Sequence, residues 1–116
     1  NDYELDLIMS KTGLSKAELL KLAGTVIVTR GELGSLVSTR DGEMPIPAVK
    51  PKQVVDPTGA GDAFRSGMIS GLVQGKTINE CAMMGSVTAS FCVECYGTQD
   101  HRFGPEEFKQ RLNGCH

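Results

Sequence analysis

The sequence predicts an α/β fold in which helices are layered against a small sheet, and three observations support this class. Two helix-like segments come first, short β-branched segments follow, and three more helix-like segments complete the order. Hydrophobic residues make up 40% and charged residues 22% of the 116 residues, as in a globular chain. The sequence has no internal repeat and no low-complexity linker. We therefore expect a single partial domain over residues 1–116, because three or four strands make too small a sheet for a complete layered fold.

Two short helices are expected before the first strand. Tyr3–Met9 has a helical pattern that is interrupted near Gly13. A second helix is expected over Lys16–Ala23, because the stretch Ser15-Lys16-Ala17-Glu18 has the form of a capping box. Gly24 is well placed to end that helix.

The strands are expected in the middle of the chain. Thr25–Thr29 is a compact β-branched run, which is typical of a buried strand. After a turn, Ser35–Thr39 continues as a second strand, and Asp41-Gly42 favours a hairpin that leads into Met44–Val49. Two prolines in this last run predict an edge strand, since proline cannot donate a ladder hydrogen bond.

Three helices are expected after a glycine-rich stretch. They are predicted at Ala63–Val73, Ile78–Cys95 and Pro105–Leu112. Gly67 and Gly71 lie four residues apart on one face of the first of these helices. This spacing indicates a face that approaches a neighbouring element closely.

Composition and charge indicate which classes of binding partner are not expected. The net charge of −2 and the pI of about 5.6 give no electrostatic reason to expect nucleic acid or an anionic membrane as a partner. No apolar run has the length of a bilayer-spanning helix, and the first residues lack the pattern of a signal peptide. We therefore expect a cytoplasmic protein, and the sequence leaves its oligomeric state open, a homo-oligomer included.

The cysteines raise one alternative function. Cys92 and Cys95 have the spacing of half a zinc site or of a redox dithiol. No second close pair exists, and the two histidines do not form a ligand doublet. The pair also lies in a run predicted to be helical, whereas a redox dithiol is expected at the start of a helix. Buried, reduced thiols are the favoured interpretation.

The stretch Pro57–Asp62 predicts an anion-binding turn. It precedes a helix, so several backbone N–H groups are expected without a partner inside that helix, at the positive end of its dipole. Glycines allow a tight turn and keep side chains away from a ligand. The stretch is not a Walker A loop, because no Gly-Lys-Ser/Thr follows, and it lacks the third glycine of the dinucleotide fingerprint.

Asp62 admits two interpretations. An acidic residue in the first helical turn is stabilised by the helix dipole and needs no further role. A carboxylate beside an anion pocket also suits phosphoryl transfer, in which a base accepts the proton of the receiving hydroxyl. The spacing alone does not decide between a simple cap and a catalytic site.

Three stretches resemble one family of enzymes. DPTGAGDAFRSGMI (Asp56–Ile69) closely resembles the C-terminal signature of the PfkB, or ribokinase-like, family of carbohydrate and nucleoside kinases. NDYE (Asn1–Glu4) resembles its Asn-x-x-Glu motif, and VTRGELGS (Val28–Ser35) resembles its Thr-x-Gly-x-x-Gly strand and turn. YGTQ (Tyr96–Gln99) is compatible with the family. The resemblance implies the C-terminal portion of a three-layer αβα fold, with the β lid and the N-terminal half absent from this sequence.

The resemblance also implies roles at the glycine-rich stretch. Asp62 would be the base, and the N–H groups of Gly59, Ala60 and Gly61 would form the anion hole. Asp56 and Thr58 match positions that contribute to a monovalent cation site, such as one for K⁺, in many relatives.

Other roles fall on the first part of the chain. The resemblance implies that Glu4 would help to organise Mg²⁺ and phosphate through water, as suits this strongly hydrated ion. The ATP site would be lined by Asn1, Thr29, Gly31 and Gly34.

Each of these roles has a structural alternative. Asn1 and Glu4 also fit a helix cap with a first-turn acid. Gly31 and Gly34 also fit a turn, and Asp56 also fits a residue that fixes its own turn. A further candidate is Arg65, whose side chain either contacts phosphate or, as we favour, is solvated.

The resemblance predicts an ATP-dependent phosphotransferase that acts on a hydroxyl of a sugar or nucleoside, with bacterial adenosine-kinase-like members as the nearest subtype. The motif DPTGAGDAFRSG and the tail GTQDHRF suggest that subtype. The alternative is a non-catalytic nucleotide-binding module from a truncated or degenerate kinase. Because most acceptor-binding sequence of the family lies in its N-terminal half, we expect the isolated 116 residues to be inactive.

Overall fold

The computed structural model describes residues 1–97 and 102–114. The chain divides into two compact units, Asn1–Ile46 and Pro47–His116, and each is described by itself. Of the family-like tail, residues 98–101 lie outside the described residues, as do residues 115 and 116. No described helix combines the length and the apolar character needed to cross a bilayer.

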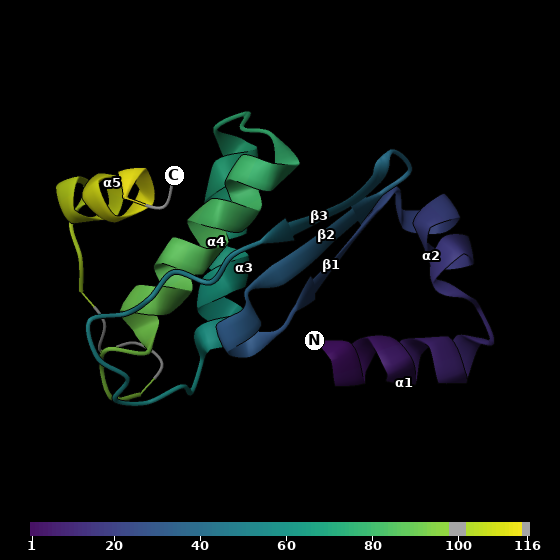
Figure 1. Ribbon diagram of the computed structural model, residues 1–116, viewed down its shortest axis with the longest axis horizontal. Helices are drawn as coiled ribbons and strands as arrows, with labels where there is room; N and C mark the ends of the chain where they lie inside the picture. Colours follow the sequence, from purple (N-terminus) through teal and green to yellow (C-terminus); the bar gives the residue numbers. More distant parts are fainter. Residues whose placement is uncertain (98–101, 115–116) are drawn as a thin grey trace. The chain divides into compact units, whose positions relative to one another are not determined.

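The first unit contains two helices and a three-stranded antiparallel sheet with the strand order β1-β2-β3 (Figure 1). Its elements are α1 (Asp2–Thr12), α2 (Lys16–Ala23), β1 (Thr25–Thr29), the 3₁₀ helix η1 (Gly31–Leu33), β2 (Ser35–Thr39) and β3 (Gly42–Ile46). An ion pair between Lys16 of α2 and Glu43 of β3 ties helix to sheet, and Ser38 donates a hydrogen bond to the same carboxylate at 3.1 Å. These contacts lower the pKa of Glu43, with the hydrogen bond from Lys16 as the largest cause.

The predicted bounds of α2, β1 and β2 are confirmed, and α1 is longer than the predicted Tyr3–Met9. The predicted burial of β1 and the predicted bounds of the third strand also need correction. In β1 only Val28 is buried, because β1 lies at one edge of the described sheet and pairs with β2 alone. The third strand is Gly42–Ile46 and not Met44–Val49, since pairing begins directly after the hairpin, with Gly42 opposite Thr39. β3 is the other edge strand, as its proline content predicted.

The second unit contains three helices, of which α3 (Ala60–Val73) and α4 (Ile78–Cys92) pack side by side and α5 (Pro105–Asn113) contacts α4. Three glycines make the contact between α3 and α4 close. A Cβ atom at Gly67 would lie 2.6 Å from the carbonyl oxygen of Met84, and one at Gly71 would lie 2.8 Å from the sulfur of Cys81. Gly85 of α4 has the reciprocal role, because a Cβ there would lie 2.8 Å from the carbonyl oxygen of Phe64. The close approach predicted from Gly67 and Gly71 is confirmed.

Two predicted helix bounds in this unit need correction: α3 begins at Ala60 and not at Ala63, and α4 is shorter than predicted. The helix ends at Cys92 and not at Cys95, because the carbonyl oxygen of Val93 accepts hydrogen bonds from the N–H groups of Val55 at 2.7 Å and Asp56 at 3.1 Å. This oxygen is therefore engaged outside the helix, and the chain continues in tighter turns. The Cys92–Cys95 pair consequently lies at the end of a helix rather than inside one.

An arginine attaches α5 to α4 within the second unit. The guanidinium of Arg111 forms a two-pronged ion pair with Glu94, at 2.8 Å and 3.3 Å, and donates to Ser90 at 3.0 Å. Its central carbon also lies 3.5 Å from the centre of the Phe91 ring. The side chains of Arg111 and Glu94 are largely buried, so this pair is shielded from solvent.

Candidate active site

The start of α3 presents unpaired backbone donors. Gly59 caps the helix with φ 82°, a left-handed conformation that favours glycine. The N–H of Ala60 bonds to the carbonyl oxygen of Pro57 at 3.2 Å. Within the described part of the chain, the N–H groups of Gly59, Gly61 and Asp62 have no hydrogen-bond acceptor. The turn therefore offers three donors at the positive end of the helix dipole.

The space beside Gly61, on the side where a side chain would project, is open. A Cβ atom added there would meet no other atom within 4 Å, and the residue is exposed. Of the three predicted amides, Gly59 and Gly61 are available, while that of Ala60 is engaged in the turn. The N–H of Asp62, which the sequence analysis did not single out, has no acceptor either among the described residues.

Asp62 is the third residue of α3 and its side chain is 78% exposed. It forms an ion pair with Arg65, one helical turn further on, whose side chain is also exposed. Arg65 is therefore paired rather than merely solvated, and the Asp-x-x-Arg spacing on a helix is the signal that predicts such a pair. The carboxylate of Asp62 is accessible to solvent and belongs to the first turn of α3. This is compatible with both interpretations of Asp62, an acid that stabilises the helix start and a catalytic base.

Asp56 fixes the turn that leads into α3. One of its carboxylate oxygens accepts from the N–H of Thr58 at 2.9 Å, and the other accepts from the N–H of Gly97 at 3.1 Å. The pKa of Asp56 is lowered by hydrogen bonds, first from the side chain of Thr58 and then from these two N–H groups. The structural alternative for Asp56 is thus observed. The contact with Gly97, 41 residues away, was not anticipated.

Cys92 is buried at the end of α4, and its thiol lies 3.6 Å from the carbonyl oxygen of Thr58. Burial is the largest cause that raises its pKa, followed by the nearby charge of Asp56. A protonated thiol is neither a nucleophile nor a metal ligand. Among the described residues, no group of three or more His, Cys, Asp and Glu side chains is arranged to hold a metal ion.

The remaining predicted residues belong to the first unit and form two groups. Asn1 and Glu4 make the capping box of α1, in which the side chain of Asn1 accepts from the N–H of Glu4 at 2.9 Å. Thr29, Gly31 and Gly34 lie at one end of the sheet, where β1 passes through η1 into β2. Gly31 and Gly34 have positive φ angles of 56° and 85°, which favour glycine. The alternative interpretation of these two residues as turn glycines is therefore also observed.

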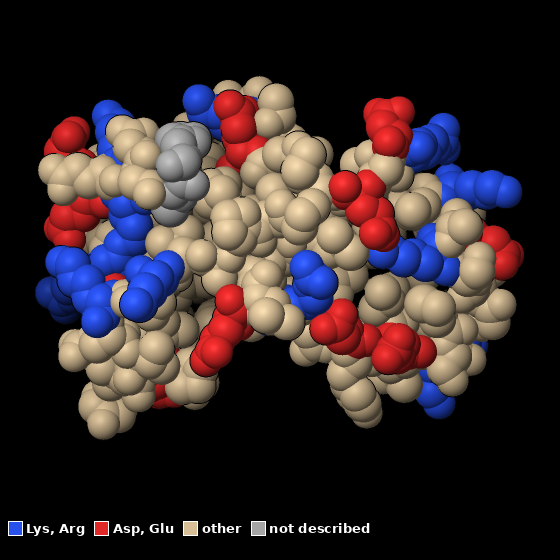
Figure 2. Space-filling model, in the orientation of Figure 1, with Lys and Arg blue, Asp and Glu red and all other residues tan. Residues whose placement is uncertain are grey.

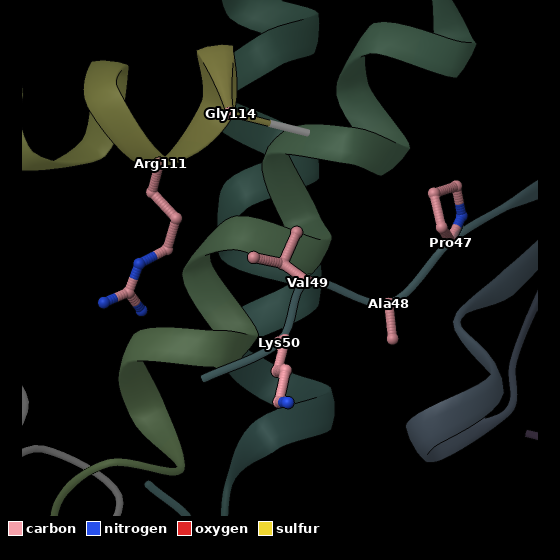
Figure 3. Close-up of a pocket in the computed structure, with 6 residues that line it drawn as sticks. All are labelled: Pro47, Ala48, Val49, Lys50, Arg111 and Gly114. Carbon is pink, nitrogen blue, oxygen red and sulfur yellow. The ribbon is translucent and has the colours of Figure 1, made fainter. Parts of the chain in front are cut away.

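A separate groove of about 390 Å³ lies on the second unit (Figure 3). Its lining consists of Pro47, Ala48, Val49, Lys50, Arg111 and Gly114. It contains none of the predicted site residues, and its Arg111 is engaged with Glu94. On the face seen in Figure 2, acidic and basic side chains are mixed with uncharged ones.

The sequence of this chain matches the model of a known protein family. The family model "pfkB family carbohydrate kinase" matches residues 1–102, so the chain belongs to this family.

Similar proteins agree with this assignment. The chain is 37% identical to a nucleoside kinase of Methanocaldococcus jannaschii over 85% of its own length and 33% of that protein. It is 45% identical to inositol 3-kinase of Arabidopsis thaliana over 69% of its own length and 22% of that protein. The chain thus spans a third or less of the length of these two curated relatives.

Solved structures show the same fold. The nucleoside kinase of Burkholderia thailandensis in complex with inosine aligns with a TM-score of 0.95 at 36% identity, over 99% of this chain and 38% of that one. The Methanocaldococcus jannaschii nucleoside kinase, described as an archaeal member of the ribokinase family, aligns with a TM-score of 0.91 over 97% of this chain and 38% of that one. The predicted fold class, a portion of a ribokinase-like α/β fold, is confirmed.

Proposed function

We propose that this chain is the nucleotide-binding and catalytic part of an ATP-dependent phosphotransferase that acts on a hydroxyl group of a nucleoside or sugar. The observation that supports this most is the start of α3, where the N–H groups of Gly59 and Gly61 have no acceptor among the described residues and the next residue, Asp62, has an exposed carboxylate. Donors for an anion and an acceptor for a proton are the two groups that phosphoryl transfer requires of the protein.

In the proposed reaction the amides at Gly59, Ala60 and Gly61 donate hydrogen bonds to the oxygens of the transferred phosphoryl group. An arriving anion would compete with the Pro57 carbonyl for the Ala60 N–H, whose present bond is 3.2 Å long. Asp62 accepts the proton of the receiving hydroxyl as the new oxygen–phosphorus bond forms and the bond to the departing ADP breaks.

ATP is proposed to contact the first unit at Asn1, Thr29, Gly31 and Gly34. Support for the nucleotide comes from the Burkholderia thailandensis kinase, whose structure was determined in complex with ADP-inosine. A Cβ atom at Gly31 would meet no atom within 4 Å, which leaves the backbone of this turn open to a ligand.

Two cations are part of the proposal, Mg²⁺ near Glu4 and a monovalent cation near Asp56 and Thr58. Glu4 supplies a carboxylate on a side chain that is 60% exposed, and a water-mediated Mg²⁺ ligand needs such access to solvent. Mg²⁺ would neutralise charge on the phosphates when bound. Hydrogen bonds lower the pKa of Asp56 and so favour its ionised form, and Thr58 follows two residues later, so oxygens of these two residues are proposed to hold a monovalent cation such as K⁺.

A nucleoside is the proposed acceptor, with an adenosine-like purine nucleoside favoured and a sugar as the competing class. The similar kinases of Methanocaldococcus jannaschii and Burkholderia thailandensis are nucleoside kinases, and the structure of the latter was determined in complex with inosine. The inositol 3-kinase of Arabidopsis thaliana supports the competing class. A cytoplasmic location, where ATP is supplied, is part of this proposal.

The test uses the longest natural polypeptide that contains this sequence (the parent polypeptide). ATP consumption is measured with a panel of purine nucleosides, pyrimidine nucleosides and sugars. Turnover with at least one nucleoside is expected. Nucleotide binding without transfer to any acceptor would favour the alternative, a non-catalytic nucleotide-binding module.

The isolated 116-residue chain is expected to turn over little or not at all. It spans a third or less of the length of the Methanocaldococcus jannaschii and Arabidopsis thaliana kinases, and acceptor recognition in the proposed enzyme requires the remaining length. The same ATP-consumption panel, applied to the isolated chain, checks this expectation. Turnover on the order of 1 s⁻¹ or faster, within the usual range for enzymes, would contradict it.

A further inference from the structure

The end of α4 holds the segment that leads into α3. The carbonyl oxygen of Val93 accepts from the N–H groups of Val55 and Asp56, at 2.7 Å and 3.1 Å. The N–H of Gly97 donates to the carboxylate of Asp56 at 3.1 Å. Two backbone N–H groups and one carboxylate of the approach to the candidate site are therefore held by one turn, which lies about 40 residues further along the sequence.

A fourth contact reaches the residue next to Gly59. The thiol of Cys92 donates a hydrogen bond to the carbonyl oxygen of Thr58 across 3.6 Å. Cys92 has no exposed surface, and burial raises the pKa of its thiol, so the S–H proton is present to be donated. This contact joins the core of the second unit directly to the glycine turn.

The geometry of the peptide group gives this contact a consequence. The carbonyl of Thr58 and the N–H of Gly59 belong to one planar trans peptide, so they point in opposite directions. A donor that draws the carbonyl toward the end of α4 therefore turns the N–H of Gly59 away from it. No other acceptor among the described residues fixes the direction of that N–H.

We propose that Cys92 is a positioning residue, which aims the N–H of Gly59 at the transferred phosphoryl group by holding the carbonyl of Thr58. This inference rests on the proposed phosphotransferase function and deepens it. Cys92 touches neither the nucleotide nor the acceptor in this account, and its effect passes through a single peptide plane.

Two substitutions in the parent polypeptide separate the hydrogen bond from the packing. Cys92→Ala removes the donor, and Cys92→Ser keeps a hydroxyl donor of similar size. Cys81→Ala is the matched control, because Cys81 is an equally buried thiol of α4 that lies 3.7 Å from the carbonyl oxygen of Lys76, at the opposite end of the helix. All three variants are expected to lose some thermal stability.

The expected difference lies in catalysis. Cys92→Ala should lower kcat roughly threefold to tenfold with little change in the KM of the acceptor, since one weakly held donor is lost in the transition state. Cys92→Ser should recover at least part of that loss, and Cys81→Ala should keep the kcat of the unsubstituted protein. Equal kcat values for Cys92→Ala and Cys81→Ala would overturn the proposal.

A second measurement does not depend on catalysis. The amide resonance of Gly59 in NMR spectra should shift in Cys92→Ala and stay in place in Cys81→Ala, because only the former frees the Thr58–Gly59 peptide. An unshifted Gly59 amide in Cys92→Ala overturns the inference whether or not the protein is a kinase. A shifted amide in a parent polypeptide that transfers no phosphate supports the positioning contact and overturns the proposed function alone.

Discussion

The start of α3 and the contact between α3 and α4 use glycine for opposite purposes. At Gly61 an added Cβ atom would meet nothing within 4 Å, so the surface is open at a residue whose N–H is a proposed donor. At Gly67, two helical turns further on, an added Cβ atom would lie 2.6 Å from a backbone oxygen of α4. One glycine keeps a surface open to a ligand, and the other allows two helices to approach. A glycine-rich helix can therefore combine a ligand-binding end with a closely packed face.

Gly67 and Gly61 should differ most in how much an alanine substitution lowers the free energy of unfolding. Gly67→Ala should destabilise the parent polypeptide by about 3 kcal/mol or prevent folding, because its Cβ atom collides with rigid backbone of α4. The free energy of unfolding from urea titration is the measurement. Gly104→Ala serves as the control, since a Cβ atom there has room and a substitution should cost about 1 kcal/mol or less. Equal stabilities of the Gly67→Ala and Gly104→Ala variants would show that the helices are not closely packed.

A smaller effect, opposite in kind, is expected at the open glycine. Gly61→Ala should keep or slightly raise stability, by up to about 1 kcal/mol, because alanine is the better helix former. Its methyl group should nevertheless lower kcat/KM roughly tenfold, since it stands where the phosphoryl group is proposed to approach. Steady-state kinetics beside a thermal melt check both parts. An active variant with unchanged kcat/KM would place the anion elsewhere.

The smallest effect concerns acid stability of the turn before α3. Hydrogen bonds lower the pKa of Asp56, so its ionised form stabilises the fold above the ordinary pKa of an aspartate, about 3.9, and this contribution is lost as the pH falls through the lower value in the folded protein. Asp56→Asn should therefore unfold with a weaker pH dependence in acid than the unsubstituted protein. Melting temperatures measured between neutral and strongly acidic pH test this, and parallel curves would contradict it.

Local patterns in the sequence predicted much of this fold. Ser15 and Glu18 predicted the start of α2 through their spacing, and Gly67 and Gly71 predicted a close helix contact. These signals act within one or two turns of a helix, where the residues involved are neighbours in the sequence.

Contacts between residues that are far apart in the sequence were not predicted. The end of α4 depends on Val93 accepting hydrogen bonds from a segment nearly 40 residues earlier, and no local pattern near Val93 reports this. The ion pair of Arg111 with Glu94 and the bond from Gly97 to Asp56 have the same character. At the candidate site, the sequence identified Asp62 and the glycines, but only the structure distinguishes the engaged Ala60 amide from its open neighbours.

The most direct test of the account concerns Asp62. Its ion pair with Arg65 is exposed, so Asp62→Asn should leave the fold of the parent polypeptide nearly unchanged. If the carboxylate accepts the proton of the receiving hydroxyl, this variant should bind nucleotide normally and lose about 10²-fold to 10⁴-fold in kcat. Full turnover by Asp62→Asn would contradict the account and would leave the glycine turn as a helix start without a catalytic role.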